Sequence, residues 1–170
     1  MKARKMAYCA VFAALLAVCG WIAVPFGSSA FTMQTFGVFL TLGLLGGKWG
    51  CVAIGVWLAM GAAGLPVFTG LRGGIGVFME ISGGYLIGFV AAGLLFWLLT
   101  FRNRGSLRTA LAMALGLVCC YACATVWYCT AYHGSLTEGL SACVVPYLVP
   151  DVLKTVLAFL LKRRLKRFVY

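Results

Sequence analysis

Long apolar segments separated by short polar breaks make up most of the sequence. Residues 6–47 contain no charged side chain, although a membrane-spanning helix needs only about 20 apolar residues. This stretch is therefore long enough for two helices. The segment 24–31, "VPFGSSAF", predicts the turn between them, because it combines a proline, a glycine and two serines.

The same pattern continues to the end of the chain. It predicts six spanning helices, at residues 6–24, 32–46, 50–65, 80–101, 109–131 and 143–161. Their connections include the tight "GGKWG" at 46–50, a glycine-rich loop at 66–78, "RNRGSLR" at 102–108 and "YHGSLTEG" at 132–139. The first segment is longer than the apolar core of a secretory signal peptide, about 7–15 residues, so we expect it to be retained. We therefore expect an all-α integral membrane protein that forms a single domain over residues 1–170.

The composition supports this class. Hydrophobic residues make up 64% of the chain and charged residues only 10%, and the mean hydropathy is +1.04. A soluble domain has about a quarter of its residues charged, so a soluble domain is excluded. The net charge of +11 comes from 14 Lys and Arg residues against three acidic residues. Because these cations flank apolar segments, they indicate membrane orientation and not nucleic-acid binding.

The positions of the cations predict the orientation. With the N-terminus inside, only Arg72 and Lys154 lie away from the termini and the inner connections. The remaining cations are Lys2, Arg4, Lys5, Lys48, Arg102, Arg104, Arg108, Lys162, Arg163, Arg164, Lys166 and Arg167. Positively charged segments stay in the cytoplasm. We therefore expect a multi-pass protein of the cytoplasmic membrane, with both termini inside and the glycine-rich loop, between the third and fourth helices, outside.

The cysteines do not indicate a metal site. Nearly all eight lie inside apolar segments, and the chain has a single histidine. Cys120 and Cys123 form a C-x-x-C pattern, but no acidic residue is near them in the sequence. Free cysteine behaves as a small apolar residue in a core, so we expect these side chains to pack.

Two opposite charges fall inside the last apolar segment. Asp151 and Lys154 are three residues apart and therefore share one helical face. Lys154 precedes Lys162 by about 12 Å of helix, so its side chain does not easily reach the inner membrane surface. An ionisable group at the centre of a spanning helix costs roughly 2.5 kcal/mol or more and by default marks a functional site. Either the pair is a structural ion pair or both groups face a cavity and bind a polar solute. Pro146 and Pro150 favour the cavity, because each removes a backbone donor.

Further polar and aromatic residues gather on the predicted outer side. Glu80 either caps the helix that begins there or takes part in a site. Gln34 lies near the start of its helix and supplies an uncharged hydrogen-bonding group, as do Thr32 and Thr35. Candidate pocket walls are Trp57, Tyr85, Tyr128 and Tyr147, although aromatic residues near a membrane surface are often interfacial anchors.

The stretch "GLPVFTGLRGGIG", residues 64–76, interrupts the apolar pattern. Glycine permits positive φ and close approach of the backbone, so this loop can fold over an outward cavity as a lid. Its amide groups, including those of Gly73 and Gly74, can hold an anion together with Arg72. The loop lacks the G-x-x-x-x-G-K-[ST] pattern of a phosphate-binding loop. Any ATPase that drives transport must therefore be another chain.

Small residues form a stripe on the first helix. Ala10 and Ala14 are four residues apart, with Ala13 and Ala17 beside them. Such stripes let helices approach closely in lipid. The stripe serves either packing within the chain or the docking of a partner.

Four stretches together resemble the BioY family, the biotin-specific substrate-binding (S) subunits of energy-coupling factor (ECF) transporters. They are "TMQTFGVFLTLGLLGGKWG", "GAAGLPVFTGLRGGIGVF", "SGGYLIGF" and "PDVLKTVLA", in that order. The resemblance covers about residues 32–160. The chain departs from the family at 80–82, where Glu-Ile-Ser replaces the usual Gly-Pro-Thr, so the entry to the helix at 80–101 stays open.

The resemblance implies a six-helix protein that is not an enzyme, has no cofactor and captures biotin from outside. It also implies partners, namely a transmembrane coupling subunit, docked by Ala10 and Ala14, and two cytoplasmic ATPase subunits that use ATP. The candidate ligand-binding residues are Gln34, Arg72, Gly73, Gly74, Glu80, Tyr85, Tyr147, Asp151 and Lys154. Which end of biotin meets which residue stays open.

Three alternatives remain at this level. The chain is an S subunit for a different small vitamin, a membrane enzyme that uses Asp151 and Glu80 as an acid/base pair, or a purely structural membrane subunit. Binding of labelled vitamins separates the first from biotin capture. The last predicts that Asp151→Asn and Lys154→Met change stability without changing solute uptake.

Overall fold

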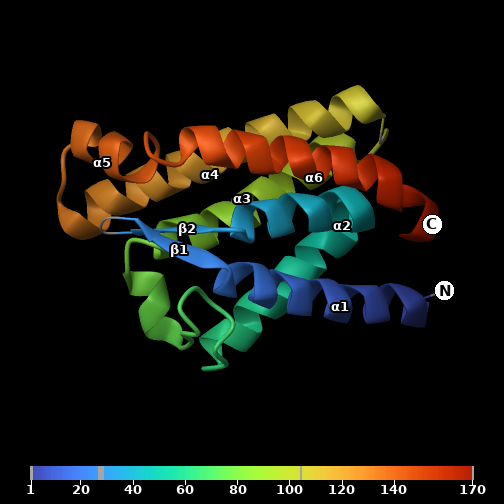
Figure 1. The fold of residues 1–170 in the computed structure, drawn as a ribbon, viewed down its shortest axis with the longest axis horizontal. Coiled ribbons are helices and arrows are strands. Elements are labelled where there is room, and N and C mark those ends of the chain that lie inside the picture. The colour runs from blue at the N-terminus through green and yellow to red at the C-terminus, as the bar shows by residue number, and fades with distance from the viewer. Residues whose placement is uncertain (1, 27–28, 104, 170) are drawn as a thin grey trace.

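The computed structural model describes residues 2–26, 29–103 and 105–169 of the chain (Figure 1). Its elements are α1 (Lys2–Trp21), β1 (Ala23–Phe26), β2 (Ser29–Thr32), α2 (Gln34–Ala62), the 3₁₀ helix η1 (Ile75–Met79), α3 (Gly83–Thr100), α4 (Ser106–Tyr132), α5 (Leu136–Cys143) and α6 (Leu148–Val169). Within the described residues, the regular structure is helical apart from one two-stranded hairpin, which confirms the all-α prediction.

A break at Gly46 divides α2 into the two helices that the sequence predicts. Gly46 has φ 78° and ψ 169°, a conformation outside the helical region. A residue with a Cβ rarely adopts positive φ, so glycine allows the chain to turn sharply here. Figure 1 shows α2 reversing its course at this break. The predicted connection at 46–50 is therefore present but much shorter, because the helix resumes directly after the glycine.

Four helices are long and apolar enough to cross a membrane: α1 over Ala3–Trp21, α2, α3 and α4. α5 and the Leu148–Leu165 part of α6 pass the same test together, with a bend of 51° between them. By length and composition, the described residues therefore supply four spans, or five if the bent pair is one span. α2 enters this count once despite its break, which is why the number is lower than the six predicted segments.

The last predicted helix, 143–161, needs correction. α6 begins only at Leu148, and a separate helix, α5, occupies part of the predicted loop at 132–139. A capping box starts α5: the Ser135 hydroxyl accepts from the Glu138 amide, and the Glu138 carboxylate accepts from the Ser135 amide. This S-x-x-E pattern is a sequence signal for a helix start, although the predicted segments do not include a helix here.

The predicted turn at 24–31 belongs to an antiparallel hairpin that the sequence did not predict. β1 pairs with β2 from Ala23 opposite Thr32 to Phe26 opposite Ser29. The pairing satisfies backbone groups between α1 and α2 that a loose turn would leave unpaired. It also fixes Thr32, which lines the cavity described below, directly before α2, and Phe31 beside it packs against Tyr147.

The molecule has two distinct ends. Figure 1 shows the N- and C-termini at one end, together with the break in α2 and the connection between α3 and α4. The hairpin, η1 and α5 lie at the opposite end. Between them, α3 packs mainly on α4, and α2 packs on α1, α3 and α6. The core that joins these helices includes Phe39, Leu42, Trp57 and Met113, all fully buried.

The glycine-rich loop has more backbone hydrogen bonds than a simple flexible lid would have, and part of the predicted loop segment is helical. It runs from Ala63 to Gly74 and is followed by η1, so α3 begins at Gly83 and not at residue 80. The Gly74 amide donates to the Gly61 carbonyl oxygen (2.7 Å), and the Phe68 amide donates to that of Arg72 (3.0 Å). These bonds fold the loop back on the end of α2.

Candidate ligand-binding site

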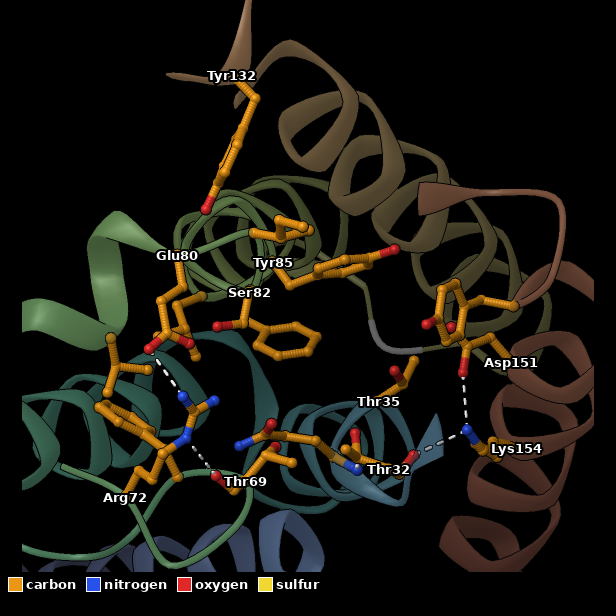
Figure 2. Close-up of a pocket in the computed structure, with 17 residues that line it drawn as sticks. Thr32, Thr35, Thr69, Arg72, Glu80, Ser82, Tyr85, Tyr132, Asp151 and Lys154 are labelled. Atoms are coloured by element: carbon orange, nitrogen blue, oxygen red, sulfur yellow. Dashed lines mark hydrogen bonds and ion pairs between the residues drawn. The ribbon is translucent and has the colours of Figure 1, made fainter. Parts of the chain in front are cut away.

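A cavity of about 390 Å³ opens at the end of the molecule that carries the hairpin and the glycine-rich loop. Its walls come from β2, the start of α2, the loop, η1, the start of α3, and α6 (Figure 2). The lining residues are Thr32, Gln34, Thr35, Phe68, Thr69, Arg72, Val77, Glu80, Ile81, Ser82, Tyr85, Leu86, Phe89, Tyr132, Tyr147, Asp151 and Lys154. Polar groups thus gather in a chain that is otherwise mostly apolar.

Asp151 and Lys154 lie on one side of the cavity, on the first turns of α6. The Lys154 ammonium bonds to Asp151 Oδ1 (3.0 Å) and donates to the Thr32 carbonyl oxygen (2.8 Å). The Tyr121 hydroxyl donates to the other carboxylate oxygen, Oδ2 (3.1 Å). The side chains of Asp151 and Lys154 are only 5% and 14% exposed. The pair therefore shares one face and points into the cavity, not into lipid.

The two prolines do not open the backbone of a spanning helix, contrary to the expectation above. Pro146 lies in the turn between α5 and α6, and Pro150 lies in the first turn of α6. In the first turn of a helix the missing amide has no intrahelical partner to lose. The prolines are thus compatible with the bend between α5 and α6, and the polar character of this wall comes from side chains.

Arg72 and Glu80 form a second ion pair on the opposite side. Arg72 Nη1 lies 2.7 Å from Glu80 Oε1, and Arg72 Nε donates to the Thr69 carbonyl oxygen (3.3 Å). Their side chains are 50% and 43% exposed, which places this pair at the mouth. The capping alternative for Glu80 is wrong, because α3 starts three residues later. The Trp127 indole also donates to the Glu80 carbonyl oxygen (3.0 Å) and fixes this segment against α4.

Apolar and aromatic walls separate the two charged pairs. Figure 2 shows Arg72 and Glu80 on one side and Asp151 and Lys154 on the other, with Tyr85 between them. The ring centroids of Tyr85 and Tyr147 are 6.1 Å apart. The Tyr85 hydroxyl donates to the Cys143 carbonyl oxygen, so this side chain joins α3 to the end of α5. The cavity therefore has two charged ends and an apolar middle.

Two polar groups at the cavity have no protein partner within the described residues: Gln34 Nε2 and Ser82 Oγ. Gln34 is only 5% exposed. Buried polar groups almost always have a hydrogen-bond partner, and leaving one unpaired costs about 1–3 kcal/mol. Both residues line the cavity, but these two atoms are themselves covered by protein, and Gln34 Nε2 lies against Gly20 of α1.

Comparison with known proteins places the whole chain in a family. Residues 1–170, the whole chain, match the BioY family. The chain belongs to the BioY family. It is 34% identical to the biotin transporter BioY of Thermotoga maritima over 96% of both chains, and 34% identical to the probable biotin transporter BioY of Pyrococcus horikoshii over 98% of both.

A solved structure shares the fold of this BioY-family chain. It is the crystal structure of the S-component for biotin from an ECF-type ABC transporter, with a TM-score of 0.87 and 26% sequence identity. The match covers 98% of this chain and 92% of that one. The broken α2, the hairpin and the bent α5–α6 pair thus belong to a fold that has a close relative among solved structures.

Seven of the nine candidate residues line the cavity, namely Gln34, Arg72, Glu80, Tyr85, Tyr147, Asp151 and Lys154. Gly73 and Gly74 do not. A Cβ at Gly73 would overlap the Leu65 carbonyl oxygen, and Gly74 has φ 99°. Because the Gly74 amide is bonded to Gly61, it is not available to an anion. These two glycines shape the loop and stay outside the cavity lining.

Other aromatic candidates lie elsewhere. Trp57 is fully buried, and its indole donates to the Val67 carbonyl oxygen (3.1 Å). This bond fixes the glycine-rich loop against α2. Tyr128 stacks on Tyr132 with ring centroids 5.7 Å apart, and only Tyr132 lines the cavity. Tyr121, the partner of Asp151, was not predicted, because it lies 30 residues away on another helix.

Proposed function

We propose that this chain captures biotin at the outer face of the cell membrane and is the substrate-specific subunit of an ECF-type transporter, acting as one membrane domain over residues 1–170. Its family membership, the names of its relatives and the biotin S-component with the same fold support this function. These relatives are transporters, so the alternative of a membrane enzyme has no support. The observation that carries the proposal is a cavity with a charged pair at each end.

The chemistry of biotin matches this cavity. Its ureido ring carries two N–H donors next to a carbonyl acceptor, its thioether ring and valeryl chain are apolar, and its far end is a carboxylate. Asp151 supplies an acceptor and Lys154 a donor 3.0 Å apart, which suits an adjacent N–H and C=O. Arg72 supplies a cation at the mouth. We therefore assign the ureido ring to the buried pair and the carboxylate to Arg72.

The apolar part of biotin then lies between the two pairs. Phe68, Leu86, Phe89 and the rings of Tyr85 and Tyr147 line this region. Burial of apolar surface contributes roughly 25 cal/mol per Å². Charged hydrogen bonds at both ends fix the orientation, and the apolar middle adds affinity. Apolar walls combined with a few polar groups that fix the orientation are typical of small-molecule sites.

The test is equilibrium binding of labelled biotin to the purified full-length chain in detergent, with riboflavin and thiamine as competitors. We expect saturable binding at one site per chain that neither competitor displaces. Absence of saturable biotin binding, together with tight binding of another vitamin, would overturn the assignment to biotin. The same preparation with biotin amide, which lacks the carboxylate charge, tests the orientation.

Transport by this family of complexes needs partners, and we propose a transmembrane coupling subunit and two cytoplasmic ATPase subunits. Ala10 and Ala14 are exposed on α1, whereas Ala13 and Ala17 are buried against the rest of the chain. The exposed pair therefore leaves a smooth surface for a helix of the coupling subunit. Ala14→Trp is expected to abolish co-purification with that subunit while biotin binding persists. Ala122→Trp, on the exposed face of α4, is the matched control.

We further propose that both termini face the cytoplasm. The termini, the break in α2 and the α3–α4 connection lie at one end (Figure 1), and the sequence places its basic residues in these segments. Such an excess of Lys and Arg favours the cytoplasmic side. The cavity, at the other end, then opens outward.

A further inference from the structure

The ion pair at the mouth of the cavity joins two separate segments of the chain. Arg72 belongs to the glycine-rich loop and Glu80 to the junction between η1 and α3, and Figure 2 shows their charged groups pointing toward each other. Arg72 Nη1 and Glu80 Oε1 are 2.7 Å apart. The Glu80 carboxylate therefore holds the same cation that the proposed function assigns to the carboxylate of biotin.

The Arg72 guanidinium has little capacity left for a second carboxylate. Its Nε donates to the Thr69 carbonyl oxygen (3.3 Å), and its Nη1 donates to Glu80. A carboxylate binds arginine most strongly through two parallel N–H groups, which belong either to Nη1 and Nη2 or to Nε and Nη2. Each choice includes a nitrogen that already has a partner. Because two carboxylates repel each other whereas the Thr69 carbonyl is neutral, Glu80 is the partner that an incoming carboxylate displaces.

The backbone on both sides of this ion pair is fixed. The Phe68 amide donates to the Arg72 carbonyl oxygen (3.0 Å). The Glu80 carbonyl oxygen accepts from the Trp127 indole (3.0 Å) and from the Gly83 amide (2.9 Å). The Glu80 side chain is 43% exposed, so its carboxylate is hydrated by the solvent when it rotates away from Arg72. The exchange thus requires rotation of one side chain and no rearrangement of the loop.

We propose that Glu80 competes with the carboxylate of the ligand for Arg72, and thereby sets how strongly the site prefers an acid to its neutral amide. The inference rests on the proposed function. Release of Arg72 from Glu80 opposes the binding of every acid by the same amount, whereas a neutral amide binds without breaking the ion pair. Glu80 is therefore a specificity-determining residue. It narrows the difference in affinity between biotin and biotin amide and leaves the ranking among acids unchanged.

The test is isothermal titration of the full-length chain in detergent, with biotin and with biotin amide as ligands. Ion pairs between exposed side chains contribute little, so Glu80→Gln is expected to tighten biotin binding about two- to fivefold. The ratio of the biotin affinity to the biotin amide affinity is expected to rise by the same factor. Unchanged or weaker binding of biotin by this variant would overturn the proposal, because Glu80 would then be irrelevant to the ligand or would hold Arg72 in place for it. An equal gain for biotin and biotin amide would also overturn it.

A second background tests whether Glu80 acts through Arg72. In an Arg72→Gln chain, the same Glu80→Gln change is expected to alter biotin affinity by less than about twofold, since the two side chains act as a coupled pair. A gain as large as in the parent background would overturn the proposal, because Glu80 would then act only by repelling anions in general.

Met79→Gln is the matched control for the new glutamine. Met79 precedes Glu80, is 66% exposed and does not line the cavity, so this variant is expected to bind biotin like the parent chain. A gain with Met79→Gln as large as that with Glu80→Gln would contradict the role of Glu80. Absence of biotin binding by the parent chain would overturn the proposed function and this inference with it, whereas failure of the Glu80 variants alone would overturn only the inference.

Discussion

Replacing Lys154 by methionine removes the cation but keeps an unbranched side chain of similar length. In the parent chain its ammonium bonds to Asp151 Oδ1 (3.0 Å) and to the Thr32 carbonyl oxygen (2.8 Å). The variant leaves the Asp151 carboxylate, 5% exposed, with the Tyr121 hydroxyl as its remaining side-chain partner among the described residues. Removal of one partner of a buried ion pair typically costs roughly 3–5 kcal/mol, so we expect a large loss of thermal stability.

The same change is expected to weaken biotin binding. A hydrogen bond to a charged group contributes about 1.5–3 kcal/mol, so loss of the Lys154 donor to the ureido carbonyl raises Kd roughly 10- to 150-fold. Isothermal titration at a temperature well below the melting point of the variant measures this change. A thermal melt of the same preparation gives the stability.

The double variant Asp151→Asn, Lys154→Met separates the two effects. It removes both charges and leaves no buried carboxylate unpaired, so stability is expected to return towards that of the parent chain. Biotin affinity is expected to stay low, because neither the charged acceptor nor the charged donor is present. If the double variant binds biotin as tightly as the parent chain, the pair is only structural and the reasoning is refuted.

Three other changes test the mouth, the loop and α5. Arg72→Gln is expected to weaken biotin binding about tenfold or more, the loss of one charged hydrogen bond, but not the binding of biotin amide; an equal loss for both ligands would contradict the assignment of the carboxylate. Leu71→Gly is expected to stabilise the protein by about 1 kcal/mol, because Leu71 has φ 57° and its exposed side chain contributes little. An unchanged or lower melting temperature would contradict this. Ser135→Ala removes the capping hydroxyl and is expected to cost about 1 kcal/mol; titration should also show weaker biotin binding, because the end of α5 holds Tyr85. Unchanged stability would show that the cap is dispensable.

Much of the helical fold follows from the sequence because lipid imposes a simple rule. Each span needs a long apolar segment with its backbone bonded internally, so charges and turn residues mark the boundaries. The break at Gly46 and the turn at 24–31 both fall where the sequence has turn residues. The short elements were harder to predict from the sequence. The hairpin pairs only four residues on each strand, and α5 has eight, so neither has enough length to show a periodic pattern.

The site was only partly predictable for a related reason. A charge inside an apolar segment is conspicuous, so Asp151, Lys154 and Glu80 stand out along the chain. The hydrogen-bond partners of these charged residues do not stand out in the sequence. Lys154 reaches the backbone carbonyl of Thr32, 122 residues away, and a backbone carbonyl has no residue signature. Gly73 and Gly74 were conspicuous too, but glycine signals a backbone requirement more often than a ligand contact, and here it shapes the loop.

The placement of charge connects the fold to the function. Arg72 and Lys154 are the two cations outside the basic segments, and each has an acid beside it, Glu80 and Asp151. The third acid, Glu138, starts α5 through the capping box, and α5 ends at the carbonyl that receives the Tyr85 hydroxyl. Every carboxylate side chain therefore lies at or supports the cavity. Since a charged group in a membrane protein is costly unless it is paired or functional, the gathering of these pairs around one cavity supports the proposed biotin site at this end.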